Sequence, residues 1–245
     1  MTGSARHQAF CEWGLAGLTA LRERVAVLVI VDVLSFSTAV DVAVSLGASI
    51  LPFAHDDEAA ARAAAAEAGA LLATGRGPAG ARAGIGPYSL SPASLVGIAP
   101  GTRLMLPSPN GSRLSLAGGA TPVLAGCFRN ATAVARHAEA LAGGRAIGVI
   151  PAGERWPDGS LRPAIEDWLG AGAILDALDQ PLAAEARVAR DAYRSAGMDL
   201  ASLVQDSRSG RDLIHGGFAA DVEIALDLDI SHTVPVLTDG AYRAA

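Results

Sequence analysis

The densest group of chemically capable side chains lies between residues 151 and 167. Only 18% of the chain is charged, yet this stretch holds four carboxylates and two arginines. The carboxylates are Glu154, Asp158, Glu166 and Asp167, and the arginines are Arg155 and Arg162. Oxygen-rich segments of this kind suit Mg²⁺, which takes one or two carboxylates together with waters and substrate phosphate. The alternative is a salt-bridged surface loop.

A second candidate is the segment that follows the most aliphatic stretch of the chain. Asp32 comes directly after Val25–Val31, and Ser37 and Thr38 follow where a helix is expected to begin. A carboxylate at a strand end could hold a divalent cation while hydroxyls and helix amides receive a phosphate. In the alternative interpretation, a hydroxyl caps the helix and Asp32 accepts hydrogen bonds from the backbone.

Two further segments could bind an anion. Asn110, Gly111 and Ser112 form a turn rich in amides and hydroxyls, which is typical of an anion-binding concavity or of an ordinary Asn-Gly turn. Arg211 follows Gly210 near an expected helix start and could bind phosphate or carboxylate through its planar fork. Because the chain contains no lysine, a Walker-type loop and a Schiff-base lysine are excluded, and arginine must supply any positively charged side chain that binds the substrate.

The elements that position these residues alternate along the chain. Short aliphatic runs predict strands at Val25–Val31, Ala48–Phe53, Leu71–Thr74, Arg103–Leu106, Thr121–Ala125 and Arg145–Ile150. Alanine-rich segments predict helices at Ser37–Leu46, Asp56–Ala68, Asn130–Ala142, Pro163–Leu178, Leu182–Ala196 and Gly217–Leu226. This order favours a three-layer α/β/α fold with a mostly parallel sheet, whose strand ends present the polar segments.

The domain organisation follows from the same alternation. No linker interrupts it, so we expect one α/β domain over residues 1–245, more helical from about residue 163. Gly75–Pro100 is rich in glycine and proline and is expected to form a long loop across the sheet.

Composition excludes several classes of partner. The net charge is −6 and no basic stripe is present, which argues against nucleic-acid binding. The longest aliphatic run is far shorter than the roughly 20 residues of a membrane span, and the amino terminus does not resemble a signal peptide, so we expect a cytoplasmic protein without membrane contacts. Two cysteines without metal-ligand spacing predict buried free thiols, and helices rich in small residues make a homodimer plausible.

Taken together, the ordered motifs resemble the 2-phosphosulfolactate phosphatase family over nearly the whole chain. The motifs are Val31-Asp32-Val33-Leu34 with Ser37-Thr38, Ser91-Pro92, Asn110-Gly111-Ser112, Gly126-Cys127-Phe128-Arg129-Asn130-Ala131, Ala152-Gly153-Glu154, Glu166-Asp167 with Ala171-Gly172-Ala173-Ile174, and Ser209-Gly210-Arg211 running to Asp221 and Val234-Pro235. The resemblance implies a three-layer α/β/α fold, Mg²⁺, and hydrolysis of the phosphate ester of a small 2-hydroxy acid that bears a sulfonate and a carboxylate. The chain departs from the family pattern at Ser35, Gly75, Pro87 and Leu90, where the family has Arg, Glu, Asp and Asn.

Two hypotheses follow. In the first, the chain is a magnesium-dependent phosphatase for a small anionic phosphate ester, with altered substrate preference. Its catalytic residues are Asp32, Ser35, Glu154 and Glu166, its phosphate-binding residues are Ser37, Thr38, Asn110, Gly111, Ser112, Arg155 and Arg211, and its metal ligands are Asp32, Glu166 and Asp167. Asp32 is preferred as a ligand over a nucleophile, and Ser35 is an alternative nucleophile or ligand. In the second, the same scaffold binds an anionic metabolite without hydrolysing it.

Overall fold

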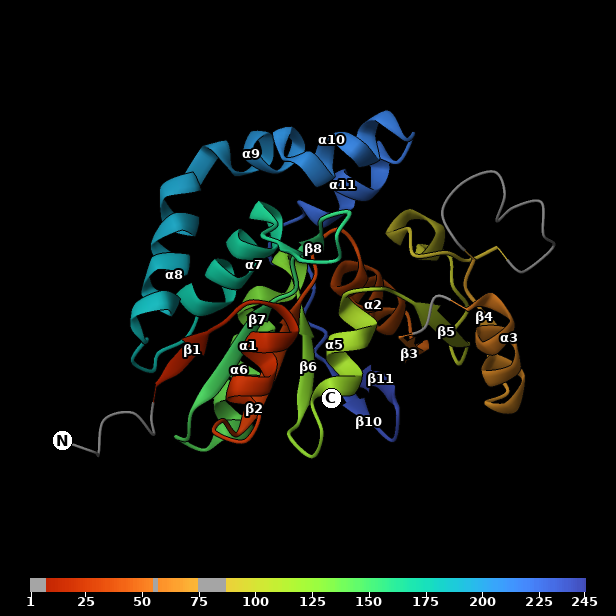
Figure 1. Ribbon diagram of the computed structural model, residues 1–245, viewed down its shortest axis with the longest axis horizontal. Coiled ribbons are helices and arrows are strands. Elements are labelled where there is room, and N and C mark those ends of the chain that lie inside the picture. Colours follow the sequence, from red (N-terminus) through yellow and green to blue (C-terminus); the bar gives the residue numbers. More distant parts are fainter. Residues whose placement is uncertain (1–7, 55–56, 75–86) are drawn as a thin grey trace.

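The computed structural model describes residues 8–54, 57–74 and 87–245. There, nine strands form one mixed sheet in the order β1-β7-β2-β6-β10-β11-β3-β5-β4, and helices lie on both faces (Figure 1). Strands β1, β7, β2 and β6 pair in parallel, as do β3, β5 and β4, and the antiparallel pair β10–β11 joins the two groups. The predicted three-layer α/β/α fold with a mostly parallel sheet is therefore confirmed.

Every predicted strand and helix overlaps an observed element, although Asp56 lies outside the described residues. The sheet strands are β1 (Ala9–Cys11), β2 (Val27–Val31), β3 (Ser49–Phe53), β4 (Leu71–Leu72), β5 (Arg103–Pro107), β6 (Val123–Gly126), β7 (Ile147–Pro151), β10 (Pro235–Thr238) and β11 (Ala241–Ala244), and a separate hairpin consists of β8 (Glu154–Arg155) and β9 (Leu161–Arg162). The helices are α1 (Gly14–Leu21), α2 (Phe36–Ser45), α3 (Glu58–Glu67), α5 (Gly111–Ala117), α6 (Ala131–Ala142), α7 (Ile165–Asp176), α8 (Ala184–Ala196), α9 (Leu200–Asp206), α10 (Arg208–His215) and α11 (Ala219–Ala225). Sequence patterns missed β1, α1, α5, α9, α10 and both hairpins.

Strand β2 shows how the sheet separates two cores. Val27, Val29 and Val31 pack with residues of α6, α7 and α8, whereas Leu28 and Ile30 pack with α1, α2 and α5. All five side chains are fully buried. Successive side chains of a strand point to opposite faces, so a strand covered on both sides reads as a continuous aliphatic run.

The last strands of the chain complete the middle of the sheet. β10 pairs with β6, β11 pairs with β3, and the buried Tyr242 ring places its hydroxyl 2.7 Å from Ser115 Oγ on α5. Asp239 and Gly240 form the turn with φ of 50° and 75°, as a two-residue hairpin loop requires. Because three antiparallel pairings separate β6 from β3, the strands β3, β5 and β4 run opposite to β2. The more helical carboxy-terminal part thus returns to the central sheet.

A buried ion pair fixes α2, the helix that follows Asp32. Asp41 on this helix is fully buried, and the Arg129 Nε donates to it at 2.9 Å while the Ser231 hydroxyl donates at 2.6 Å. Burial raises the pKa of Asp41, and the hydrogen bonds from Ser231 and Arg129 counteract this effect. The contacts tie α2 to the 3₁₀ turn η3 (Phe128–Asn130) and to the segment before β10.

The predicted long loop Gly75–Pro100 is described only from residue 87 onward. That part contains the 3₁₀ turn η2 (Pro92–Leu95), which Asp221 on α11 holds by accepting from the Ser91 hydroxyl at 2.5 Å and the Ala93 N–H at 3.0 Å. Both cysteines are buried free thiols, as predicted. Within the described ranges, no helix has the length and apolar character needed to cross a membrane.

Candidate active site

Asp32 joins two loops that follow strands far apart in the sheet. It lies directly after β2 and is 6% exposed. One carboxylate oxygen accepts from the Phe36 N–H at 3.2 Å, and the other accepts from the Gly111 N–H at 2.8 Å. At position 111 a Cβ atom would lie 2.2 Å from the Phe36 ring, so glycine is required for this approach. The structure therefore brings Asp32 and the Asn-Gly turn together.

Three hydroxyls that were predicted to bind phosphate form hydrogen bonds with the main chain. Ser37, Thr38 and Ser112 are fully buried, and their hydroxyls donate to the carbonyls of Ile30, Val33 and Leu106, respectively. These hydroxyls therefore hold the loops around Asp32 in place, and a contact with phosphate stays a prediction.

Asp167, in the first turn of α7, connects the loops after β2 and β7. Its Oδ1 accepts from the Val33 N–H at 2.7 Å, and its Oδ2 accepts from the Gly153 N–H at 2.9 Å. Burial raises the pKa of Asp167 well above its ordinary value, and the negative charges of Asp32, Glu166 and Glu154 raise it further. Each of these three carboxylates is therefore close enough to repel Asp167.

Glu166 is the most unusual member of this group. It is 1% exposed, and its Oε2 has no hydrogen-bond partner among the described residues. A buried acceptor without a partner is costly, and such atoms in native proteins often mark a bound ion or a catalytic role. Glu166 is therefore the candidate ligand with the clearest structural signal.

Glu154 stands at the start of the β8–β9 hairpin and faces the Asn-Gly turn. The Asn110 side-chain amide donates to Glu154 Oε2 at 2.9 Å, and the Arg155 guanidinium donates to the Pro109 carbonyl at 3.3 Å. Asn110 thus orients a carboxylate, and its contact with phosphate stays a prediction. Gly153, with a φ of +67°, allows the chain to turn into the hairpin.

Glu154 and Arg155 line two neighbouring cavities of about 200 and 270 Å³. The smaller one is also bordered by Trp13, Asn110 and Arg113. The remaining lining of the larger one comes from three segments, namely Leu34, Arg162, and Arg208, Ser209, Asp212 and Leu213 of α10. Arg208 was missed, and Ser209 was recognised only as part of a motif, because the chain before Arg211 was not recognised as helical.

Arg211, which was predicted to bind phosphate, lies away from both cavities. It is exposed, it does not line either cavity, and its guanidinium donates to the Asp206 carbonyl at the end of α9. On the same helix, Arg208 is the arginine that lines the larger cavity.

Ser35 lies just before α2 and is 1% exposed, and its carbonyl accepts from the Ala39 N–H at 2.9 Å. The peptide between Leu34 and Ser35 is cis. A role for the Ser35 hydroxyl as nucleophile or ligand stays a prediction.

The predicted metal ligands do not form a three-carboxylate shell. Within the described part of the chain, no three His, Cys, Asp or Glu side chains are arranged to hold one metal ion. The oxygens of Asp32 and Asp167 accept backbone N–H groups, which leaves Glu166 as the ligand candidate with a fully available oxygen. A smaller site of one or two carboxylates matches the usual coordination of Mg²⁺.

Comparison with known proteins gives consistent matches. A family model described as 2-phosphosulpholactate phosphatase matches residues 17–240. A protein of Methanothermobacter thermautotrophicus named 2-phosphosulfolactate phosphatase is 37% identical over 142 residues, which are 57% of this chain and 58% of the relative. One of Pseudothermotoga lettingae named probable 2-phosphosulfolactate phosphatase is 28% identical over 140 residues, or 57% and 59% of the two chains. The chain thus matches somewhat more than half the length of these relatives.

Proposed function

The chain belongs to the 2-phosphosulpholactate phosphatase family, and we propose that it hydrolyses the phosphate ester of a small 2-hydroxy acid. The natural substrate of this proposal is 2-phosphosulfolactate or a close analogue. The observation that carries the proposal is the group of four buried or half-buried carboxylates beside a cavity lined by arginines. Such a site combines groups that hold a cation and move protons with groups that bind anions.

The residues fit Mg²⁺ as its cofactor. Glu166 and Asp32 would hold the ion, because Glu166 Oε2 is buried without a partner and the Asp32 carboxylate lies on the neighbouring loop. The pKa of Asp167 is raised first by burial and then by the negative charges of Asp32, Glu166 and Glu154, which a bound cation would offset. When bound, Mg²⁺ would orient the phosphate and offset the charge that develops on its oxygens.

The protein side chains divide the remaining work. Arg155 borders both cavities and would bind phosphate oxygens through its fork. Glu154 would take a proton from the attacking water and return it to the alcohol oxygen, as the bond from phosphorus to that oxygen breaks and the bond to water forms. Asn110 orients Glu154 for this role.

A second candidate function is binding of an anionic metabolite without hydrolysis. The observation that favours it is Ser35, a buried serine at a position where an arginine is the family pattern. Loss of a positively charged side chain next to Asp32 would weaken stabilisation of the transition state more than it weakens binding of the ester, since phosphoryl transfer depends on positioning and electrostatics.

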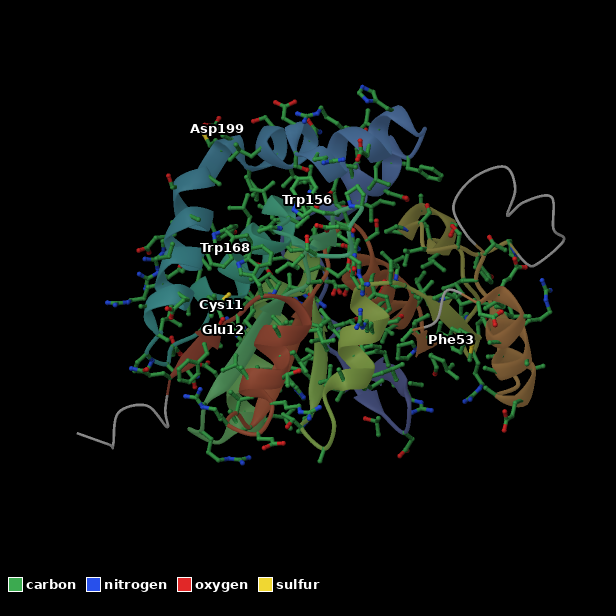
Figure 2. The ribbon with its side chains drawn as sticks, viewed as in Figure 1. Cys11, Glu12, Phe53, Trp156, Trp168 and Asp199 are labelled. Carbon is green, nitrogen blue, oxygen red and sulfur yellow. The ribbon has the colours of Figure 1, made fainter. Side chains whose placement is uncertain are left out.

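Release of inorganic phosphate from 2-phosphosulfolactate, 2-phospholactate and phosphoglycerates, with Mg²⁺ and with a chelator, tests the proposal. The Asp32→Asn and Glu154→Gln variants should lose the metal-dependent turnover. The matched control is Asp199→Asn, because Asp199 is exposed at the start of α9 (Figure 2). If none of the esters is hydrolysed and the chain still binds them in calorimetry, the second function is favoured.

The remaining expectations are proposals of the same kind. A cytoplasmic location and a homodimer stay predictions, as does the absence of nucleic-acid partners.

A further inference from the structure

The larger cavity has a charge pattern that one phosphate group does not explain. Three arginines line it, namely Arg155, Arg162 and Arg208. Its volume of about 270 Å³ is below the roughly 300–1,000 Å³ of pockets for drug-sized ligands, so it suits a small metabolite. We infer that Arg162 and Arg208 form a second anion subsite, which selects phosphate esters whose organic part carries a further carboxylate or sulfonate. This inference rests on the proposed phosphatase function.

The two arginines come from different elements and are held in place. Arg162 on β9 donates to the Ser209 hydroxyl of α10 at 2.9 Å, and the Arg208 guanidinium lies 5.2 Å from the centre of the Trp156 ring in the hairpin. Figure 2 shows Trp156 directly below α10 in that view. These contacts run in both directions between the hairpin and α10, so they fix the guanidinium groups relative to each other. Pre-positioned forks of this kind suit planar or tetrahedral oxyanions.

The acidic groups that face the cavity leave an excess of positive charge. Glu154 and Asp212 are the carboxylates of its lining, against three arginines. Asp212 lies 4.0 Å from Arg208, and the two side chains are 73% and 55% exposed. Exposed ion pairs of this geometry contribute little free energy to stability, so Arg208 can exchange Asp212 for a ligand with only a small loss of free energy.

The location assigns the subsite to the organic part of the substrate. Glu154 and Arg155 border this cavity and the neighbouring one, and Asn110 links Glu154 to the turn that contacts Asp32. Arg162 and Arg208, in contrast, line only the larger cavity. An ester bound with its phosphate near Glu154 would thus direct its acid group toward these two residues.

A series of three esters with zero, one and two acid groups tests the inference. Isopropyl phosphate has no acid group, 2-phospholactate has one on the same carbon skeleton, and 2-phosphosulfolactate has two. In Arg162→Gln and Arg208→Gln, kcat/KM should fall about 10- to 100-fold for the acid-bearing esters, as expected for loss of a hydrogen bond to a charged group, and stay within about twofold for isopropyl phosphate. Arg187→Gln, on the exposed surface of α8, is the matched control.

Two further variants separate charge from structure. Arg208→Lys keeps the charge and should restore part of the preference for acid-bearing esters. Ser209→Ala removes the bond to Arg162 but no charge, so it should reduce that preference less than Arg162→Gln does. An equal loss in Ser209→Ala and Arg162→Gln would overturn the inference, because it would assign Arg162 a structural role only.

The outcomes also distinguish this inference from the proposed function. Equal losses on all three esters would overturn the subsite and leave the phosphatase standing. If the wild-type chain hydrolyses none of them, the phosphatase proposal fails. In that case, calorimetry measures whether sulfoacetate binds, which tests the anion subsite without any need for activity. Binding that weakens about tenfold or more in both glutamine variants would support it, and unchanged or absent binding would refute it.

Discussion

Replacing Glu166 with glutamine should make the protein more stable and less active. Glu166 Oε2 is buried without a partner in the described chain, and its charge helps to raise the pKa of Asp167. Removing the charge ends that repulsion and replaces a desolvated carboxylate with a neutral amide of the same shape. We expect a gain of about 1–3 kcal/mol, because an unpaired buried charge costs more to desolvate than an unpaired buried amide and because the repulsion with Asp167 is removed. At about 2–4 °C for each kcal/mol in a chain of this size, the unfolding midpoint should rise by roughly 2–12 °C.

The predicted rise of the unfolding midpoint is checked by thermal unfolding, monitored by circular dichroism, once in a chelator and once with Mg²⁺. Wild-type protein should gain stability from the metal, about 2.7 kcal/mol at a concentration one hundred times the dissociation constant, whereas Glu166→Gln should gain far less. Glu223→Gln, exposed on α11, is the control. A Glu166→Gln protein that unfolds at or below the wild-type midpoint in chelator, and responds to Mg²⁺ as the wild type does, would refute the reasoning.

The same experiment has a pH dependence with a defined sign. A carboxyl group with a raised pKa in the folded state binds its proton more tightly there than in the unfolded chain, so its contribution to stability declines as pH rises above 3.8, the ordinary value of Asp167. Without the Glu166 charge this decline should be smaller. The stability advantage of Glu166→Gln over the wild type should therefore grow between pH 4 and pH 7. An advantage that stays constant over this range would mean that the charge of Glu166 does not raise the pKa of Asp167.

Three further predictions concern the frame of the site. Gly111→Ala should cost at least about 1–3 kcal/mol in urea unfolding, because its Cβ would overlap a buried aromatic ring, whereas Gly97→Ala, which meets no atom within 4 Å, should be neutral. Asp167→Asn should cost about 1–3 kcal/mol in the same assay, because an amide offers one acceptor to two N–H donors, while Glu154→Gln should leave stability nearly unchanged. Burial raises the pKa of the Cys127 thiol, so a thiol reagent at pH 8 should label it only after unfolding; rapid labelling of the native protein would contradict the buried position.

The sequence predicted the elements that carry strong hydrophobic patterns and missed those that depend on turns. β2 and β7 are buried on both faces, so their aliphatic runs are unmistakable. The two missed hairpins are short, but each contains an Asp-Gly pair, Asp158-Gly159 and Asp239-Gly240, which is a strong local signal for a hairpin. Counting that signal would have found the hairpin at the site and the hairpin in the central sheet.

For the candidate site, residue type predicted which carboxylates lie near one another, and their roles stay predictions. Asp32, Glu154, Glu166 and Asp167 do gather, as expected for segments that follow neighbouring strands. The buried serine and threonine hydroxyls were assigned to phosphate because a hydroxyl at a helix start has the same sequence pattern whether it faces a ligand or a backbone carbonyl. Arg208 had no signal of its own, since its position depends on how α10 packs over the hairpin.

The contacts of the four carboxylates divide them into two functional pairs. Asp32 and Asp167 each accept two backbone N–H groups and hold together the loops after β2, β5 and β7. A carboxylate held this way fixes geometry before any ligand arrives, which is the condition for electrostatic preorganisation. Glu154 lines both cavities, and Glu166 has a buried oxygen without a partner among the described residues. Asp32 and Asp167 therefore build the frame. Asp32 would in addition join Glu166 in holding a cation, and Glu154 would carry the proton during hydrolysis.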